Sequence, residues 1–249
     1  MYTLYTICAG RGAQWTYSHR TAELADVMIT ARALLDGVGP TIGVQILREG
    51  NGSSGIKMAA VEQVRESWPD VIARVARSVV GIKVGEKIVG AGVSVASGIL
   101  TAHHVVGNVA TTITVVDHLG VAHVVDVLMK EESKDLVLLQ GINAMDVLLP
   151  GDAASLRWGE TVGVFGAPRG YSHSYTEGVV SHPKRKITMP LGYEIEVFQL
   201  DASVHPGNSG GPVFDRQGKL LGMSIATYGD NENLAFAIPV NVLQAFGDF

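Results

Sequence analysis

The chain has 249 residues, a formal net charge of −5 at pH 7, and 47% hydrophobic against 17% charged residues. This composition favours a well-buried, turn-rich globular protein over an intrinsically disordered chain. Neither sign of charge forms a long run, and the one short basic cluster, 183–186, is predicted to be a solvated loop, so nucleic-acid binding is not expected.

The first residues show no targeting signal. Residues 1–5 lack the basic region and long apolar core of a signal peptide, and no stretch of about 18 apolar residues could span a membrane. Cys8 is the only cysteine, so an internal disulfide is excluded, which favours either a reducing compartment or a fold that relies on its core for stability. We therefore expect a cytoplasmic protein without membrane contact.

Residues 1–50 are predicted to form a small ββαβ module. Alternating β-rich residues at 2–8 and 15–18 indicate two strands, and 41–47 indicates a third. Between them, apolar residues at helical spacing predict a helix over 22–36. No catalytic motif falls in this module. It could be a propeptide, a regulatory module or a recruitment module, and it could mediate contact with a partner protein or a homo-oligomer.

A second domain is predicted to follow a flexible linker. Residues 51–57 include the end of a Gly- and Ser-rich stretch, which is typical of linkers, and the second domain spans 58–249. Ser67 and Asp70 can form a capping box for a short helix. From residue 78 onward, short β-like segments separated by turn signals predict a mainly β architecture. The segments are 79–84, 88–95, 98–101, 111–116, 122–129, 136–139, 160–165, 175–180, 194–200, 212–214, 220–226 and 235–238.

Residues 201–212 read DASVHPGNSGGP and place Ser209 in a glycine-rich turn between two apolar runs. Glycines permit backbone angles that other residues resist, so such a turn can aim successive N–H groups at one point. We predict that Ser209 is a nucleophile and that the amides of Gly207 and Ser209 form an oxyanion hole. The alternative is a tight hairpin with a capping serine. Since a serine hydroxyl is a weak nucleophile, the first interpretation requires a base and a group that orients it.

Both groups occur upstream, in the order His, Asp, Ser. The histidine pair at 103–104 supplies the base, and adjacent side chains point in different directions, so only one is expected to face Ser209. Asp135 opens the apolar run 136–139, which would hold its carboxylate behind the histidine. Asp117 lies in a predicted hairpin turn, and Asp126 lacks such a run, so Asp135 is favoured.

With these three motifs, the chain from about residue 68 to its end resembles the trypsin-like serine peptidases and, within them, the HtrA/Deg branch. The resemblance implies two six-stranded antiparallel β-barrels with their boundary near 148–157. It selects His104 as the base, because the family's catalytic histidine directly precedes the Val or Cys of the motif. It places His104 and Asp135 in the first barrel and Ser209 in the second. Further similar stretches are VIARVARSVVGI (71–82), LPGDAASLRWGE (149–160), VFGAPRG (164–170) and LAFAIPVN (234–241).

The resemblance implies a serine endopeptidase that cleaves polypeptides through an acyl-enzyme, without a cofactor. The eight histidines show no His-Glu-x-x-His pattern, so no metal site is expected. Ser203 stands six positions before the nucleophile, where specificity for Lys or Arg would need an acidic residue, so small or aliphatic residues are expected before the scissile bond. The competing interpretation is a catalytically silent or switched-off peptidase fold that binds peptides. The predicted substrate pocket comprises Ser203, His205, Ser224, Ile225, Ala226 and Leu234.

Overall fold

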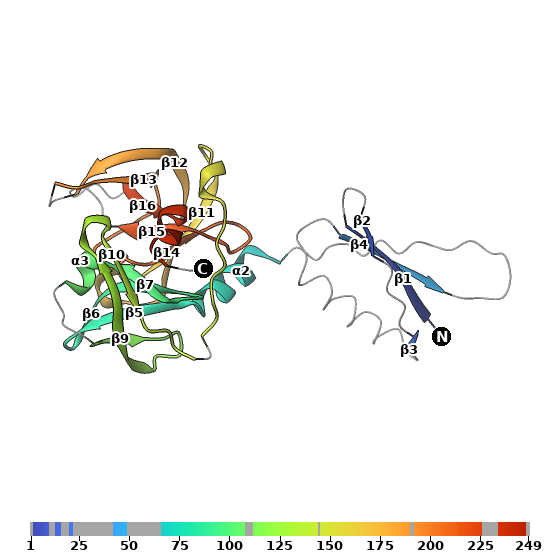
Figure 1. Cartoon of the computed structure of the whole chain (residues 1–249), viewed down its shortest axis with the longest axis horizontal. Coiled ribbons are helices and arrows are strands. Elements are labelled where there is room, and N and C mark those ends of the chain that lie inside the picture. The colour runs from blue at the N-terminus through green and yellow to red at the C-terminus, as the bar shows by residue number, and fades with distance from the viewer. Residues whose placement is uncertain are drawn as a thin grey trace. The chain divides into compact units, whose positions relative to one another are not determined.

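The chain divides into two compact units, Met1–Arg65 and Glu66–Phe249, which Figure 1 draws by residue colour. The computed structural model describes residues 66–107, 112–143, 145–189, 192–225 and 234–247 in full, and the backbone of 2–9, 13–15, 20–21 and 42–48. The predicted linker at 51–57 lies outside the described residues, so the domain boundary stays a prediction.

The described part of the first unit is an antiparallel sheet. Its long strands β1 (Tyr2–Ala9) and β4 (Ile42–Arg48) pair along most of their length, with a register irregularity between Leu4 and Thr6. Two short strands, β2 (Ala13–Trp15) and β3 (Arg20–Thr21), pair with β1. The predicted strands at 2–8 and 41–47 coincide with β1 and β4, whereas the predicted helix over 22–36 lies outside the described residues.

The second unit contains two closed six-stranded antiparallel barrels, as predicted (Figure 1). The first barrel has the strand order β10-β7-β6-β5-β8-β9. Its inward side chains are mostly Val, Ile and Leu, which favour a pleated and half-buried surface. The strands are β5 (Val79–Val84), β6 (Lys87–Val95), β7 (Gly98–Ala102), β8 (Thr112–Val116), β9 (Ala122–Glu131) and β10 (Leu136–Leu139).

The second barrel has the strand order β11-β12-β13-β16-β15-β14. The connection from the first barrel contains the 3-10 turn η2 (Ala153–Ser155), within the predicted boundary region. The last strand leads into helix α4 (Val240–Gln244). The strands are β11 (Thr161–Gly166), β12 (Ser174–Thr188), β13 (Glu194–Leu200), β14 (Pro212–Phe214), β15 (Leu220–Ile225) and β16 (Ala235–Pro239).

Helix α2 (Trp68–Ala76) precedes both barrels in the chain and packs against the second one. The Ser67 side chain accepts a hydrogen bond from the Asp70 amide, so the predicted N-cap is present, and Val71 and Val75 are fully buried. The Trp68 indole contacts the Phe214 ring, with centroids 5.6 Å apart, and donates to the Glu177 carboxylate. Two further groups, the Tyr175 hydroxyl and the Arg216 guanidinium, also hydrogen-bond Glu177, so the helix is attached to the barrel by one shared carboxylate.

The prediction that the basic cluster 183–186 forms a loop is wrong. The cluster lies inside strand β12, where Arg185 pairs with Val197 and Lys186 pairs with Glu196. The sequence pattern failed because Pro183 and three consecutive basic residues are typical of loops. Register irregularities on both sides of His182 accommodate the proline, and Glu196 on the neighbouring strand neutralises Lys184 at 2.9 Å.

Among the described residues, no helix has the length and apolar character needed to cross a membrane.

Candidate active site

His104 and Asp135 form a closely coupled pair in the first barrel. His104 is the second residue of the short helix α3 (His103–Val106), which directly follows β7, and Asp135 follows the 3-10 turn η1 (Glu132–Lys134) directly before β10. The His104 ring nitrogen Nδ1 lies 2.7 Å from the Asp135 oxygen Oδ2, and the His104 amide donates to Oδ1 at 2.8 Å. Because an ionised carboxylate can only accept hydrogen bonds, this contact places a proton on Nδ1, and in the neutral imidazole Nε2 then keeps its lone pair.

The backbone of Asp135 is as firmly held as its carboxylate. Its φ of 57° lies in the left-handed region, which Asp tolerates better than most side chains, and its carbonyl accepts from the His103 amide at 3.0 Å. The Asp135 side chain is 5% exposed, so its buried charge depends on the two contacts that the carboxylate makes with His104. This arrangement fixes both the position and the tautomer of the His104 imidazole, which at 42% exposure remains accessible.

The alternative histidine and aspartates lie in other surroundings. The His103 side chain is half-buried and has no hydrogen-bond partner within the described residues. Asp117 sits in the β8–β9 hairpin, where it accepts from the amides of Leu119 and Val121 and pairs with His123 at 2.8 Å. Asp126 is exposed on β9.

The Ser209 turn is anchored on several sides. Ser209 is buried, and its carbonyl accepts from the Ala91 amide of the first barrel at 2.9 Å. The Ser224 hydroxyl, which is fully buried, donates to the carbonyl of Asn208 at 2.6 Å. Gly210 has a φ of 87°, and a Cβ there would lie 2.1 Å from the Ala91 carbonyl oxygen, so the close approach of the two barrels requires glycine.

Two backbone amides of this turn remain available. The amides of Asn208, Gly210 and Gly211 donate to the carbonyls of residues 205, 224 and 208. Those of Gly207 and Ser209 donate to no group among the described residues. Backbone N–H groups without an acceptor beside a serine are the kind of donor from which an oxyanion hole is built.

The direction of the Gly207 amide is set by a neighbouring loop. The carbonyl of Pro206 accepts from the Arg169 amide in the 3-10 turn η3 (Pro168–Gly170) at 3.3 Å, and the carbonyl of Gly207 accepts from Ala167 at 2.9 Å. Every described peptide bond is trans, so the Gly207 N–H points away from η3, opposite to the Pro206 carbonyl. No sequence motif predicts a role for this loop, because its contacts are made by the backbone and leave no side-chain signature.

The η3 loop is itself attached to the first barrel. His173, with a φ of 59°, places its Nε2 2.9 Å from the carbonyl of Val79 in β5. Sequence reasoning also missed this contact, since an isolated histidine outside a motif carries no signal. The loop therefore joins the Ser209 turn of the second barrel to a strand of the first.

The Ser209 hydroxyl and the His104 ring form no hydrogen bond with each other within the described residues. Catalytic hydrogen bonds are often long in structures without substrate and tighten only in the complex, so the absence of this bond does not exclude a nucleophile and its base. Among the described residues, no group of three or more His, Cys, Asp or Glu residues is placed to hold a metal ion.

The residues predicted to line a substrate pocket have mixed surroundings. Ser203 and His205 are half-buried, with Ser203 Oγ 3.1 Å from His205 Nε2, directly before the Ser209 turn. Ser224 supports the turn through its hydroxyl, and Ile225 is 2% exposed on β15. Leu234 is half-buried, and Ala226 lies outside the described residues. Their role in substrate recognition stays a prediction.

Comparison with known proteins identifies a trypsin-like peptidase domain in this chain. The model of the trypsin-like peptidase domain matches residues 90–223. A serine protease Do-like HtrB from Bacillus subtilis (strain 168) is 34% identical over 159 residues, covering 60% of this chain and 34% of the relative. A serine protease HtrA-like from Staphylococcus aureus (strain USA300) is 36% identical over 131 residues, covering 47% of this chain and 17% of the relative. The chain thus spans about a third or less of the length of these relatives.

Solved structures are similar over most of the chain. The HtrA-type protease AlgW with a tripeptide has a TM-score of 0.64 and 25% identity, covering 72% of this chain and 63% of that one. A serine endoprotease from Yersinia pestis has a TM-score of 0.59 and 26% identity, covering 74% and 66%. The matched family model covers more than half of the 249 residues and contains His104, Asp135 and Ser209. The chain therefore belongs to the trypsin-like peptidase family, with HtrA-like serine proteases among its homologues.

Proposed function

We propose that the chain is a serine endopeptidase that hydrolyses polypeptides through an acyl-enzyme intermediate on Ser209. The observation that carries this proposal is the His104–Asp135 pair, joined at 2.7 Å, together with a serine turn that keeps two amides available. The interpretation as a peptide-binding module without catalysis accounts less well for a buried carboxylate that orients one imidazole through two hydrogen bonds.

In the first step, His104 Nε2 takes the proton of the Ser209 hydroxyl as its oxygen attacks the peptide carbonyl. Asp135 keeps the imidazole in the required tautomer and stabilises the imidazolium that forms. The Gly207 and Ser209 amides stabilise the negative charge on the tetrahedral oxygen. His104 then returns the proton to the leaving amine, and water releases the acyl group by the reverse sequence.

The proposed preference is for small or aliphatic residues before the scissile bond. Ser203 carries no charge, and its hydroxyl is engaged with His205, so a bound lysine or arginine would lack an anionic partner there. Burying an unpaired cation is costly. A peptide library should show Val, Ala, Ile or Leu ahead of Lys and Arg, and a profile dominated by basic residues would contradict this specificity.

The test compares the wild type with Ser209→Ala and, as a matched control, Ser155→Ala, which removes an exposed hydroxyl on η2. A fluorophosphonate should label the wild type and Ser155→Ala but not Ser209→Ala. Hydrolysis of an ester and of casein should fall by roughly 10⁴–10⁶-fold only in Ser209→Ala. Wild-type protein that folds but neither labels nor hydrolyses would favour the silent peptide-binding module instead.

A further inference from the structure

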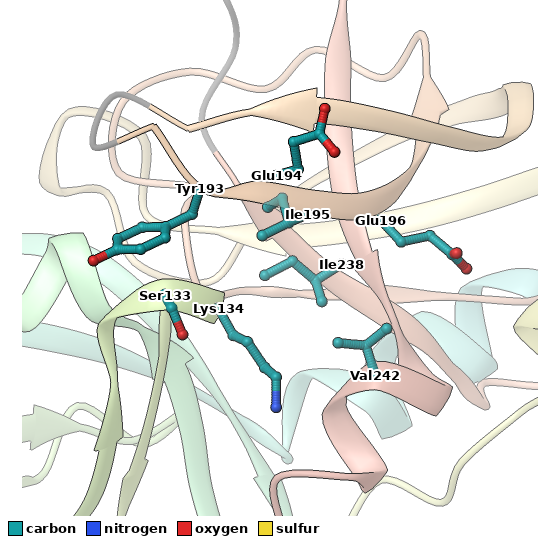
Figure 2. Close-up of a pocket in the computed structure, with 8 residues that line it drawn as sticks. All are labelled: Ser133, Lys134, Tyr193, Glu194, Ile195, Glu196, Ile238 and Val242. Carbon is teal, nitrogen blue, oxygen red and sulfur yellow. The ribbon is translucent and has the colours of Figure 1, made fainter.

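A pocket of about 310 Å³ is lined by Ser133 and Lys134, which directly precede Asp135. No residue of the Ser209 turn lines it. Figure 2 shows its floor, formed by Ile195 of β13, Ile238 of β16 and Val242 of α4. The opposite wall is η1, which contributes Ser133 and Lys134. The pocket therefore lies between η1 of the first barrel and elements of the second barrel.

The pocket exists because strands β13 and β16 separate. They pair from Phe198 to Leu200, but β16 then continues along β15 and turns into α4. Residues 194–197 of β13 pair with β12 on one side only, and no described strand pairs with them on the other. A strand edge that is open on one side can accept an extended peptide as an additional strand.

The lining defines the chemistry of a peptide that would fit. The aliphatic floor favours a branched aliphatic side chain as the anchor. The lining carries two carboxylates, Glu194 and Glu196, and one ammonium, Lys134. Lys134 pairs with Glu131 at 3.0 Å and Glu196 pairs with Lys184 at 2.9 Å, whereas Glu194 is exposed and has no ion-pair partner within the described residues. The uncompensated carboxylate favours a basic residue next to the anchor.

We propose that this pocket is a docking site for the polypeptide substrate itself, which it binds through an extended segment outside the scissile bond, with an aliphatic anchor and a neighbouring Lys or Arg. This inference rests on the proposed function. Lys134 on the pocket wall is covalently next to Asp135, which holds His104. Since an extended chain advances about 3.3 Å per residue, a few residues beyond the scissile bond are enough for one substrate to reach both sites.

The kinetic test compares a four-residue core peptide with the same core lengthened by eight residues that contain Ile-Lys pairs, on either end. One extended series should have a lower KM than the core peptide. Val242→Asp should reduce this advantage by about tenfold, because it places a charge on the aliphatic floor. Glu194→Lys should reduce it by about two- to fivefold and should transfer the advantage to peptides with Ile-Glu pairs. The matched controls are Val124→Asp and Asp126→Lys on the exposed face of β9, which should leave the advantage unchanged.

Binding is measured separately from catalysis with the Ser209→Ala variant and the fluorescein-labelled extended peptide. Anisotropy should report binding that Val242→Asp weakens and Val124→Asp does not, and this result stands or falls independently of whether the wild type hydrolyses anything. Equal binding by both variants overturns the docking site. The unlinked extension peptide, added in trans, should inhibit cleavage of the extended substrate only; if it accelerates cleavage of the core peptide, the pocket takes a separate effector and the proposal is wrong.

Discussion

Replacing Gly207 by alanine tests whether the backbone of the serine turn supplies the oxyanion donor. Gly207 has a φ of +104°, and a Cβ there would lie 2.1 Å from the Ala167 carbonyl oxygen. That contact is far below van der Waals distance. The new Cβ is fixed to the backbone of residue 207 and the oxygen belongs to the backbone of Ala167, so no side chain can rotate to relieve the clash, and the turn must move away from η3. The hydrogen bonds from Ala167 to Gly207 (2.9 Å) and from Arg169 to Pro206 (3.3 Å) would then be lost, and with them the direction of the Gly207 amide.

The expected loss follows from the role of one donor. Removing one oxyanion donor costs roughly 10²–10³-fold in kcat, or about 2.7–4 kcal/mol. A non-glycine residue in such a backbone region costs about 1–3 kcal/mol of stability. Gly159→Ala is the matched control, because its φ is +81° and a Cβ there meets nothing within 4 Å. It should lower the melting temperature but retain turnover.

The assay measures kcat with a saturating ester, normalised to the fraction of protein that a fluorophosphonate labels, and the melting temperature of each variant. A Gly207→Ala variant that folds and turns over within about threefold of Gly159→Ala would refute the reasoning, because one lost donor is expected to cost roughly 10²-fold or more. The Gly207 amide would then contribute little to stabilising the transition state.

Three further outcomes are expected. His104→Ala should reduce hydrolysis as much as Ser209→Ala, with the double variant scarcely worse, whereas His103→Ala should retain most activity; a reversed order in ester assays would exchange the two histidines. Hydrogen bonds from Trp68 and then Tyr175 lower the pKa of Glu177, so Glu177→Gln should destabilise the fold near pH 7, and the difference from wild type should shrink as pH falls below 4.5, measured by urea unfolding. The fragment 58–249 should fold and cleave small peptides, as thermal melting and ester turnover would show; an insoluble or inactive fragment would contradict the proposed domain boundary.

Most of the barrel architecture could be predicted from sequence because its signal is local. Alternating or continuous apolar runs between glycine-containing turns marked each strand of the second unit, with bounds such as 111–116 against the observed Thr112–Val116. The largest error concerned β12, which extends to Thr188. Whether a basic, proline-containing segment pairs as a strand depends on acidic partners that lie on another strand, and no local pattern reports them.

The candidate site also has a part that local sequence motifs predict and a part that depends on contacts made only in the folded chain. His104, Asp135 and Ser209 could be proposed from motifs because their chemistry needs particular side chains in a particular order. The supports of the turn could not, because η3 acts through the amide of Arg169 and any residue has such an amide. Ser224 was predicted to line a substrate pocket, and that role stays a prediction. Its buried hydroxyl also donates to the Asn208 carbonyl, a contact that is set by folding of the barrel and that no motif reports.

These supports fix the two barrels relative to each other at the Ser209 turn. The first barrel supplies the imidazole and its carboxylate, and it also fixes the serine turn through the Ala91 amide, which donates to the Ser209 carbonyl. Thr101 holds the same strand by donating to the Ala91 carbonyl at 2.7 Å, and that carbonyl is the atom that excludes a side chain at Gly210. The position of Ser209 relative to His104 is therefore determined by backbone contacts across the junction of the barrels. A small relative shift of the barrels would misplace the proposed nucleophile relative to its proposed base, even though the side chains of His104, Asp135 and Ser209 remained intact.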